Sequence, residues 1–244
     1  MQDHGRPPNA APPTLAPPTL APPIDPMVDA RRFMVDGQLR PNRVTDPFLL
    51  AAMGDLPRHR FLSPTLSPWA HADADVPLPN GRVLMQPMVI AKLMQLLALR
   101  QGDRVLVVGA GRGYAAAVLA RMGGRVVALE ADAAMAAEAR RLLPGLVPPG
   151  AVTVEEGPLA EGFAAGGPYD AILIEGEVPE IPAALSGQLA EGGRLATILA
   201  GGVRGAGPRA VLGRRAGASF ALADAFDAFT APLPGFRPAP AFVF

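Results

Sequence analysis

The clearest pattern in the chain is a short apolar run that ends in alternating glycines. Residues 105–108 (VLVV) are apolar and mostly β-branched, which is typical of a strand buried on both faces of a parallel sheet. The run is followed by Gly109, Gly111 and Gly113, and residues 114–122 are good helix formers. A strand, a glycine turn and a helix start in this order favour a site for a nucleotide-like cofactor.

The rest of the chain alternates between segments with helical and with strand-like patterns. Helices are expected at 28–39, 48–53, 88–99, 133–143 and 182–189, and strands at 125–129, 152–154, 171–174, 194–199, 211–215 and 220–226, the last two as a hairpin. This alternation predicts an α/β fold, with a doubly wound, mostly parallel sheet, helices on both faces and an N-terminal helical extension.

The N-terminal region differs from the remainder by a proline repeat, APPTL-APPTL-APPI. Proline removes backbone donors and favours an extended conformation, so this segment is expected to stay outside the core. We interpret residues 1–26 as a disordered tail and residues 27–244 as one folded domain. Docking of the tail to a proline-recognising partner is the alternative. The apolar end at 242–244 is expected to pack back onto the domain.

Composition narrows the class of protein. A chain of 244 residues, half of them apolar, can form one domain with a substantial core. The formal net charge is zero, so nothing argues for nucleic acid or an anionic membrane as a partner, and the lack of cysteine excludes disulfides and thiolate chemistry. There is no long uncharged apolar stretch and no apolar core of a signal peptide near the start, so a cytoplasmic protein is expected.

An acidic residue ends the strand that follows the glycine turn. Glu130 lies about twenty residues beyond Gly109, the spacing at which dinucleotide-binding proteins place an acid that accepts hydrogen bonds from ribose hydroxyls. We therefore expect the bare glycine main chain to face Glu130 across an open slot. Tyr114 stands where the dinucleotide fingerprint has its last glycine, and no acid/base pair for hydride transfer is evident. An NAD-dependent oxidoreductase is therefore the less favoured hypothesis.

Other polar groups have both a functional and a structural interpretation. His71, Asp73 and Asp75 form an H-x-D-x-D run that could hold a hard metal ion, but no further ligands follow, so we expect a surface loop and no metal site. His59 is expected to be a solvated residue. Four arginines could clamp an acidic substrate, although a surface position is favoured for each: Arg40, Arg58, Arg60 and Arg82.

Several short segments resemble the protein-L-isoaspartate O-methyltransferase family, a branch of the S-adenosylmethionine (SAM) methyltransferases. They lie within residues 28–199 and are Gln38-Leu39-Arg40, Leu56-Pro57-Arg58 with Phe61, Gln86-Pro87, the glycine turn, PYDAI at 168–172, Gln188-Leu189 and GGRL at 192–195. The resemblance implies a Rossmann-like methyltransferase fold, SAM as the cofactor, and a protein or peptide substrate whose isoaspartyl residues are repaired by carboxyl O-methylation.

The resemblance also implies roles for individual residues. Gly109, Gly111 and Gly113 would line SAM, Glu130 would hold its ribose, Gly157, Pro158 and Leu159 would pass near the adenine, and residues 83–87 would lie over the methionine end and the substrate, with Met85 and Gln86 at the catalytic position.

Three positions depart from the family pattern. Val107 replaces an acidic residue that faces the methionine portion of SAM, Pro158 replaces an acidic residue near the base, and Met85 replaces a serine regarded as important in catalysis. Glu175 and Glu177 follow a strand at the same sheet edge and are candidate replacements for the lost acidic contacts. The alternative function is therefore a diverged member that binds SAM but methylates another substrate, or a non-catalytic binding module.

Overall fold

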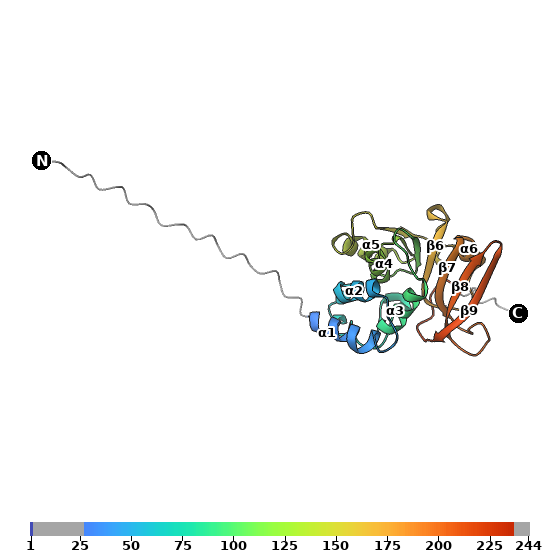
Figure 1. Cartoon of the computed structure of the whole chain (residues 1–244), viewed down its shortest axis with the longest axis horizontal. Coiled ribbons are helices and arrows are strands. Elements are labelled where there is room, and N and C mark those ends of the chain that lie inside the picture. The colour runs from blue at the N-terminus through green and yellow to red at the C-terminus, as the bar shows by residue number, and fades with distance from the viewer. Residues whose placement is uncertain (2–26, 237–244) are drawn as a thin grey trace.

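The computed structural model describes Met1 and residues 27–236, and its central feature is a seven-stranded sheet with the strand order β5-β4-β3-β6-β7-β8-β9 (Figure 1). Its strands are β3 (Arg104–Val108), β4 (Arg125–Glu130), β5 (Val152–Glu156), β6 (Tyr169–Val178), β7 (Leu189–Leu199), β8 (Arg209–Ala216) and β9 (Ser219–Asp227). A separate antiparallel ribbon pairs β1 (Val76–Pro77) with β2 (Val83–Leu84).

The helices agree with the expected segments to within a few residues. They are α1 (Val28–Met34), which continues into a π-helical turn (Val35–Leu39), α2 (Pro47–Asp55), α3 (Pro87–Leu96), α4 (Tyr114–Arg121), α5 (Ala133–Leu142) and α6 (Ala183–Gly187). Asp46 caps α2 by accepting hydrogen bonds from Phe48 N and Leu49 N at 2.9 and 3.1 Å, and Pro47 then occupies the first helical position, where no N–H is needed.

The sheet is doubly wound, as the alternation of elements predicted. β3 pairs in parallel with β4 on one side and β6 on the other, so the chain reverses its winding direction between these two neighbours. β8 and β9 are antiparallel and form the predicted hairpin at the edge. The carboxyl ends of β3, β4 and β6 therefore meet at the reversal point, where ligands bind in open α/β sheets.

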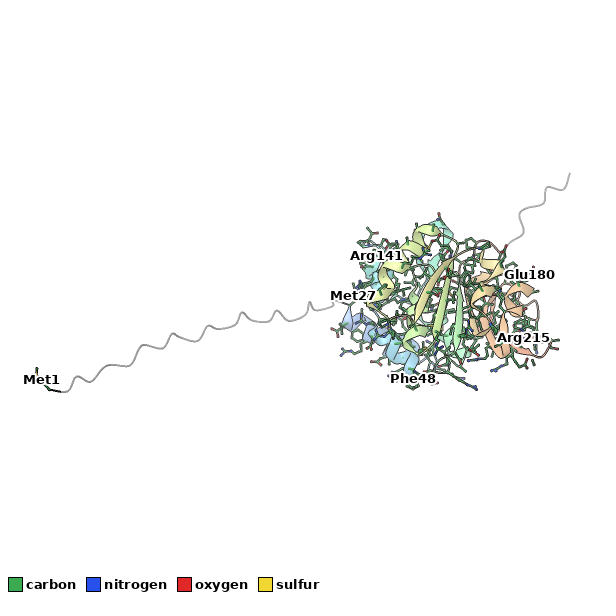
Figure 2. All side chains as sticks on the ribbon, turned by 90° about the horizontal axis from the view of Figure 1, so that it is seen from above. Met1, Met27, Phe48, Arg141, Glu180 and Arg215 are labelled. Atoms are coloured by element: carbon green, nitrogen blue, oxygen red, sulfur yellow. The ribbon has the colours of Figure 1, made fainter. Side chains whose placement is uncertain are left out.

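The two faces of the sheet are covered differently. Val105 and Val107 point into a core shared with α2, α3 and α4, whereas Leu106 and Val108 point into a second core that includes Leu185 of α6. Figure 1 shows α1 to α5 gathered beside the sheet, away from the edge strands β8 and β9. The view in Figure 2 places Arg141 of α5 and Arg215 of β8 on opposite sides of the domain.

The second core is closed by the segment that follows β9. We call residues 228–236 the C-terminal strap. Its Leu233 and Phe236 are buried in the second core, and its main chain bonds to β6 through Glu177 N to Ala231 O at 3.2 Å and Leu233 N to Glu177 O at 2.8 Å. The expectations for the proline tail (1–26) and for the apolar end (242–244) concern residues outside the described range. Among the described residues, no helix is long and apolar enough to cross a membrane.

Candidate functional site

The glycine turn lies at the carboxyl end of β3, as predicted. Gly109 and Gly111 have φ values of +74° and +55°, a region that glycine adopts without the steric cost of a Cβ. Gly113 occupies the position immediately before α4. The turn leaves main-chain groups of Gly109 and Gly111 available to side chains from other elements, and two such side chains come from β4 and from the loop between β1 and β2.

Glu130 faces the glycine turn from the end of β4. Its Oε2 accepts a hydrogen bond from Gly111 N at 2.6 Å, and its Oε1 accepts bonds from Ala131 N at 2.9 Å and Asp132 N at 3.0 Å. Three main-chain donors thus fix the carboxylate in one orientation. Such donors replace the hydration that the carboxylate loses on burial.

The guanidinium of Arg82 occupies the space between Glu130 and the glycine turn. Arg82 Nη1 lies 3.0 Å from both carboxylate oxygens of Glu130, and Arg82 Nη2 donates to the carbonyl oxygen of Gly109. The two side chains are only 6% and 1% exposed. A carboxylate has about four lone-pair sites, and five donor contacts already converge on Glu130, so ribose hydroxyls could bind it only after Arg82 withdraws.

Leu233 of the C-terminal strap fills the neighbouring space. A Cβ placed on Gly109 would lie 2.9 Å from Leu233 Cδ1, and one on Gly176 would lie 2.7 Å from Leu233 Cβ. The strap therefore packs directly against bare main chain at the ends of β3 and β6. The expectation of an open slot over the glycines is wrong for this conformation, because Arg82 and Leu233 fill it with the protein's own side chains.

A cavity of about 330 Å³ remains on the outer side of Glu130. It is lined by Asn80, Arg82, Glu130, Ala131, Asp132, Met135, Pro158, Leu159, Pro234 and Gly235. The structure thus brings Pro158 and Leu159, the residues expected near adenine, to the same cavity as Glu130. Gly157 is held beside them by the hydrogen bond from its N–H to Glu130 O at 3.2 Å. The volume is at the lower end of the range for small-molecule sites.

Glu175 and Glu177 lie within β6 and do not follow it as expected, because the strand continues to Val178, beyond the part that pairs with β3. Ile174 pairs with Val108, so Glu175 lies beside Gly109 at the sheet edge. Its Oε1 is buried and makes no hydrogen bond with the described residues. Burial raises the pKa of the Glu175 carboxyl to about 8, an effect that Arg82 and Arg58 oppose and Glu130 reinforces.

Arg58 and Tyr114 lie near Glu175 and contact each other. The Arg58 guanidinium lies 4.5 Å from the centre of the Tyr114 ring, donates from Nε to Ala70 O at 2.7 Å, and donates from Nη2 to Met85 O. Burial lowers the pKa of Arg58 and raises that of Tyr114, while the attraction between the guanidinium and the phenol oxygen opposes both shifts. Arg58 therefore ties the loops at 70 and 85 to the first turn of α4.

The two expected catalytic-position residues lie on the loop that enters α3. Met85 is buried, and Gln86 is half-buried. Gln86 N donates to Asp75 Oδ1 and Gln86 Nε2 to Asp73 Oδ1, both at 2.7 Å, and Thr230 Oγ1 of the strap donates to Asp75 Oδ2 at 2.7 Å. Asp75 thus joins the α3 entry to the C-terminal strap.

Several predictions for polar side chains are wrong in position. Arg58 and Arg82 are buried rather than on the surface, because each has acceptors supplied by distant loops, whereas Arg40 and Arg60 are exposed as predicted. His59 is half-buried beside the His71 ring, at 6.5 Å between ring centres, instead of solvated. The H-x-D-x-D run is a partly exposed loop, as expected, and its acids also accept hydrogen bonds from Gln86 and Thr230.

Sequence reasoning did not place Arg82 against Glu130 or Leu233 over the glycine turn. Arg82 comes from the loop between β1 and β2, 48 residues before Glu130, and Leu233 lies beyond the last strand. No local pattern marks either residue as part of the site. The acids Glu130 and Glu175 at the sheet edge could have indicated a buried cation, because a buried carboxylate needs a partner.

Known proteins share both the sequence and the fold. A family model described as Protein-L-isoaspartate(D-aspartate) O-methyltransferase (PCMT) matches residues 32–201. The protein-L-isoaspartate O-methyltransferase of Methanoregula boonei is 43% identical over 178 residues, covering 72% of this chain and 81% of that protein. The one from Methylorubrum populi is 44% identical over 170 residues, covering 69% and 79%.

A solved structure described as a protein-L-isoaspartate O-methyltransferase superposes with a TM-score of 0.71 and 25% identity, covering 84% of this chain and 67% of that one. The matched region of the family model ends before β8, so the edge hairpin and the C-terminal strap lie beyond it. With the parallel strands β3 to β7, the glycine turn and Glu130 all inside the match, the chain belongs to the protein-L-isoaspartate O-methyltransferase family.

Proposed function

We propose that the chain is a SAM-dependent carboxyl O-methyltransferase that acts on isoaspartyl residues of damaged proteins. The observation that carries the proposal is the buried Glu130 carboxylate. It is fixed by Gly111 N at 2.6 Å and opens onto the cavity that Pro158 and Leu159 line. An oriented acid beside a glycine turn, at the reversal point of a parallel sheet, suits the adenosine part of SAM.

The residues present fit the adenosine end of the cofactor. Glu130 would accept hydrogen bonds from the ribose, and the cavity lined by Met135, Pro158 and Leu159 would take the base. Gly109, Gly111 and Gly113 would line the cofactor along the turn. When bound, SAM supplies a methyl group on a sulfonium, whose transfer forms an O–CH₃ bond and breaks an S–CH₃ bond, leaving a methyl ester and a neutral thioether.

The reaction requires little acid/base catalysis by the protein. The accepting carboxyl of an isoaspartyl residue is ionised at neutral pH, since an unperturbed acid of this type has a pKa of about 4. The rate then depends on holding the reacting atoms in line and on excluding water. Met85 at the usual serine position is compatible with this chemistry, and Arg58 helps by fixing the loop that carries Met85 and Gln86.

Transfer of labelled methyl groups from SAM to an isoaspartyl peptide tests the proposal. We expect a base-labile ester that releases methanol, whereas the matched peptide with an ordinary aspartyl residue should give only background. Raised thermal stability with SAM but no ester would favour the diverged-substrate or binding-module alternative. The absence of both stabilisation and ester would contradict the proposal, since a specific ligand stabilises the folded state by mass action.

A further inference from the structure

We propose that the Glu175 carboxylate and the Gly109 carbonyl oxygen bind the α-ammonium group of the cofactor's methionine end. The inference rests on the proposed function and assigns a cofactor-binding residue particular to this chain. Val107 cannot supply the acidic contact that the family pattern provides, because its side chain is apolar and is buried in the core shared with α2, α3 and α4.

The first argument is the cation that already occupies this place. Arg82 Nη2 donates to Gly109 O, its guanidinium contacts Glu130 at 3.0 Å, and its charge also acts on Glu175. The space beside Gly109 is therefore built to hold positive charge. A ligand that reaches it must replace the guanidinium with a cation of its own, or leave buried acids without a partner.

The second argument is the balance of hydrogen-bond partners. Ribose would take the lone pairs of Glu130 that Arg82 now occupies, which leaves the Gly109 carbonyl and Glu175 as acceptors at the inner end. Glu175 Oε1 is buried without a hydrogen bond among the described residues. An ammonium has three N–H donors and a sulfonium has none, so these acceptors match the ammonium rather than the reacting sulfur.

The third argument separates Glu175 from Glu177, the other acid on the same strand end. Glu175 lies among charged and phenolic groups from several elements: Arg58, Arg82, Tyr114 and Glu130. Glu177 pairs with Ile198 of β7, and its main chain bridges to Pro232 of the strap. Glu175 thus borders the glycine turn, whereas Glu177 borders the strap and serves as the matched control.

Isothermal titration calorimetry near pH 7 tests the assignment with three ligands. SAM and S-adenosylhomocysteine both carry the α-ammonium group, and 5′-methylthioadenosine lacks the amino-acid portion. In the free protein, the pKa of about 8 keeps Glu175 mostly protonated, and an ammonium beside it favours the carboxylate. Wild-type protein should therefore release most of one proton to the buffer with the first two ligands and none with the third, as measured in buffers of different ionisation enthalpy.

Glu175→Gln should bind S-adenosylhomocysteine about tenfold more weakly, without proton release, and should bind 5′-methylthioadenosine as the wild type does. Glu177→Gln should match the wild type with all three ligands. Unchanged affinity and proton release in Glu175→Gln would overturn the assignment while leaving the proposed function intact. Failure of the wild type to bind any of the three ligands would overturn both, and thermal unfolding of each variant verifies that it folds.

Discussion

The outer and inner ends of the candidate site are held by different kinds of contact. At the outer end, main-chain N–H groups of Gly111, Ala131 and Asp132 fix Glu130, and the neighbouring cavity is already formed. At the inner end, long side chains from separate loops hold the space, and the strap covers it. The difference indicates that the cavity for the base and the orientation of Glu130 are preorganised, whereas Arg82 and the strap must move before the ribose and the methionine end can bind.

At the inner end, the strap lies beyond the family match, whereas Arg82 and Glu175 lie within it. The glycine turn, Glu130 and residues 157–159 lie within the matched residues 32–201, but Leu233 lies beyond them. The outer end is thus built from the part of the chain that its relatives share. The strap closes the inner end. We therefore expect substitutions in the strap to change ligand affinity more than the rate of methyl transfer.

Glu130→Gln should have the largest effect, because Glu130 contacts Arg82 at the inner end and the main-chain donors at the outer end. Arg82 would lose the carboxylate that it contacts at 3.0 Å, and three main-chain donors would face an amide. We expect a loss of about 4 to 5 kcal/mol in the free energy of unfolding by chemical denaturation. SAM affinity should fall about 100-fold by calorimetry, because a charged acceptor for the ribose is removed.

The matched control is Glu156→Gln at the end of the neighbouring strand. Glu156 pairs with Glu130 in register, but its carboxylate forms a surface ion pair with Arg140. Removing that pair should cost less than about 1 kcal/mol and leave SAM binding unchanged. Equal losses in the two variants would contradict the special position of Glu130.

Glu175 should make stability depend on pH in an unusual direction for an acid. Its pKa rises from 4.5 to about 8 on folding, so the folded state holds a proton that the unfolded state releases. The contribution is complete below about pH 4.5 and is lost as pH rises to about 8, with a total of at most about 5 kcal/mol. Urea unfolding between these pH values should show this decline in the wild type and a flatter profile in Glu175→Gln. A decline that persists in Glu175→Gln would assign it to another group.

The outer end could be predicted from the sequence because its signals are local. An apolar run, glycines and an acid at a fixed spacing predict Gly109, Gly111 and Glu130 at one sheet edge, because consecutive strands joined by one helix pair in parallel with their carboxyl ends together. The inner end could not, since the burial of Arg58 and Arg82 depends on acceptors 12 to 48 residues away. A surface position for each arginine was the reasonable expectation until those acceptors were located, because charged residues are seldom buried without partners.

Arg82→Gln should lower the free energy of unfolding of the ligand-free protein but raise its affinity for SAM. Glu130 would keep its main-chain donors but lose its counter-charge, at a cost of about 3 kcal/mol. SAM should bind about tenfold more tightly, because it no longer competes with the guanidinium. Arg121→Gln, which removes a longer ion pair of 3.4 Å to exposed Asp55, should change neither quantity. Weaker SAM binding by Arg82→Gln would instead place Arg82 among the groups that hold the cofactor.

Leu233→Ala should have the smallest effect. It tests the contribution of the strap separately from that of the charged residues. The Leu233 side chain is buried against Gly109 and Gly176, so its truncation should cost about 2 kcal/mol. SAM affinity should rise about threefold, because a less firmly packed strap is displaced at lower cost. Leu185→Ala removes an equally buried side chain from the same core but lies on α6. It should lower stability by a similar amount with no gain in affinity, because its packing is the same whether the strap is open or closed. If the two variants behaved alike in calorimetry, the strap would contribute to the core without restricting access. A gain confined to Leu233→Ala would mean that part of the strap's packing energy opposes cofactor entry.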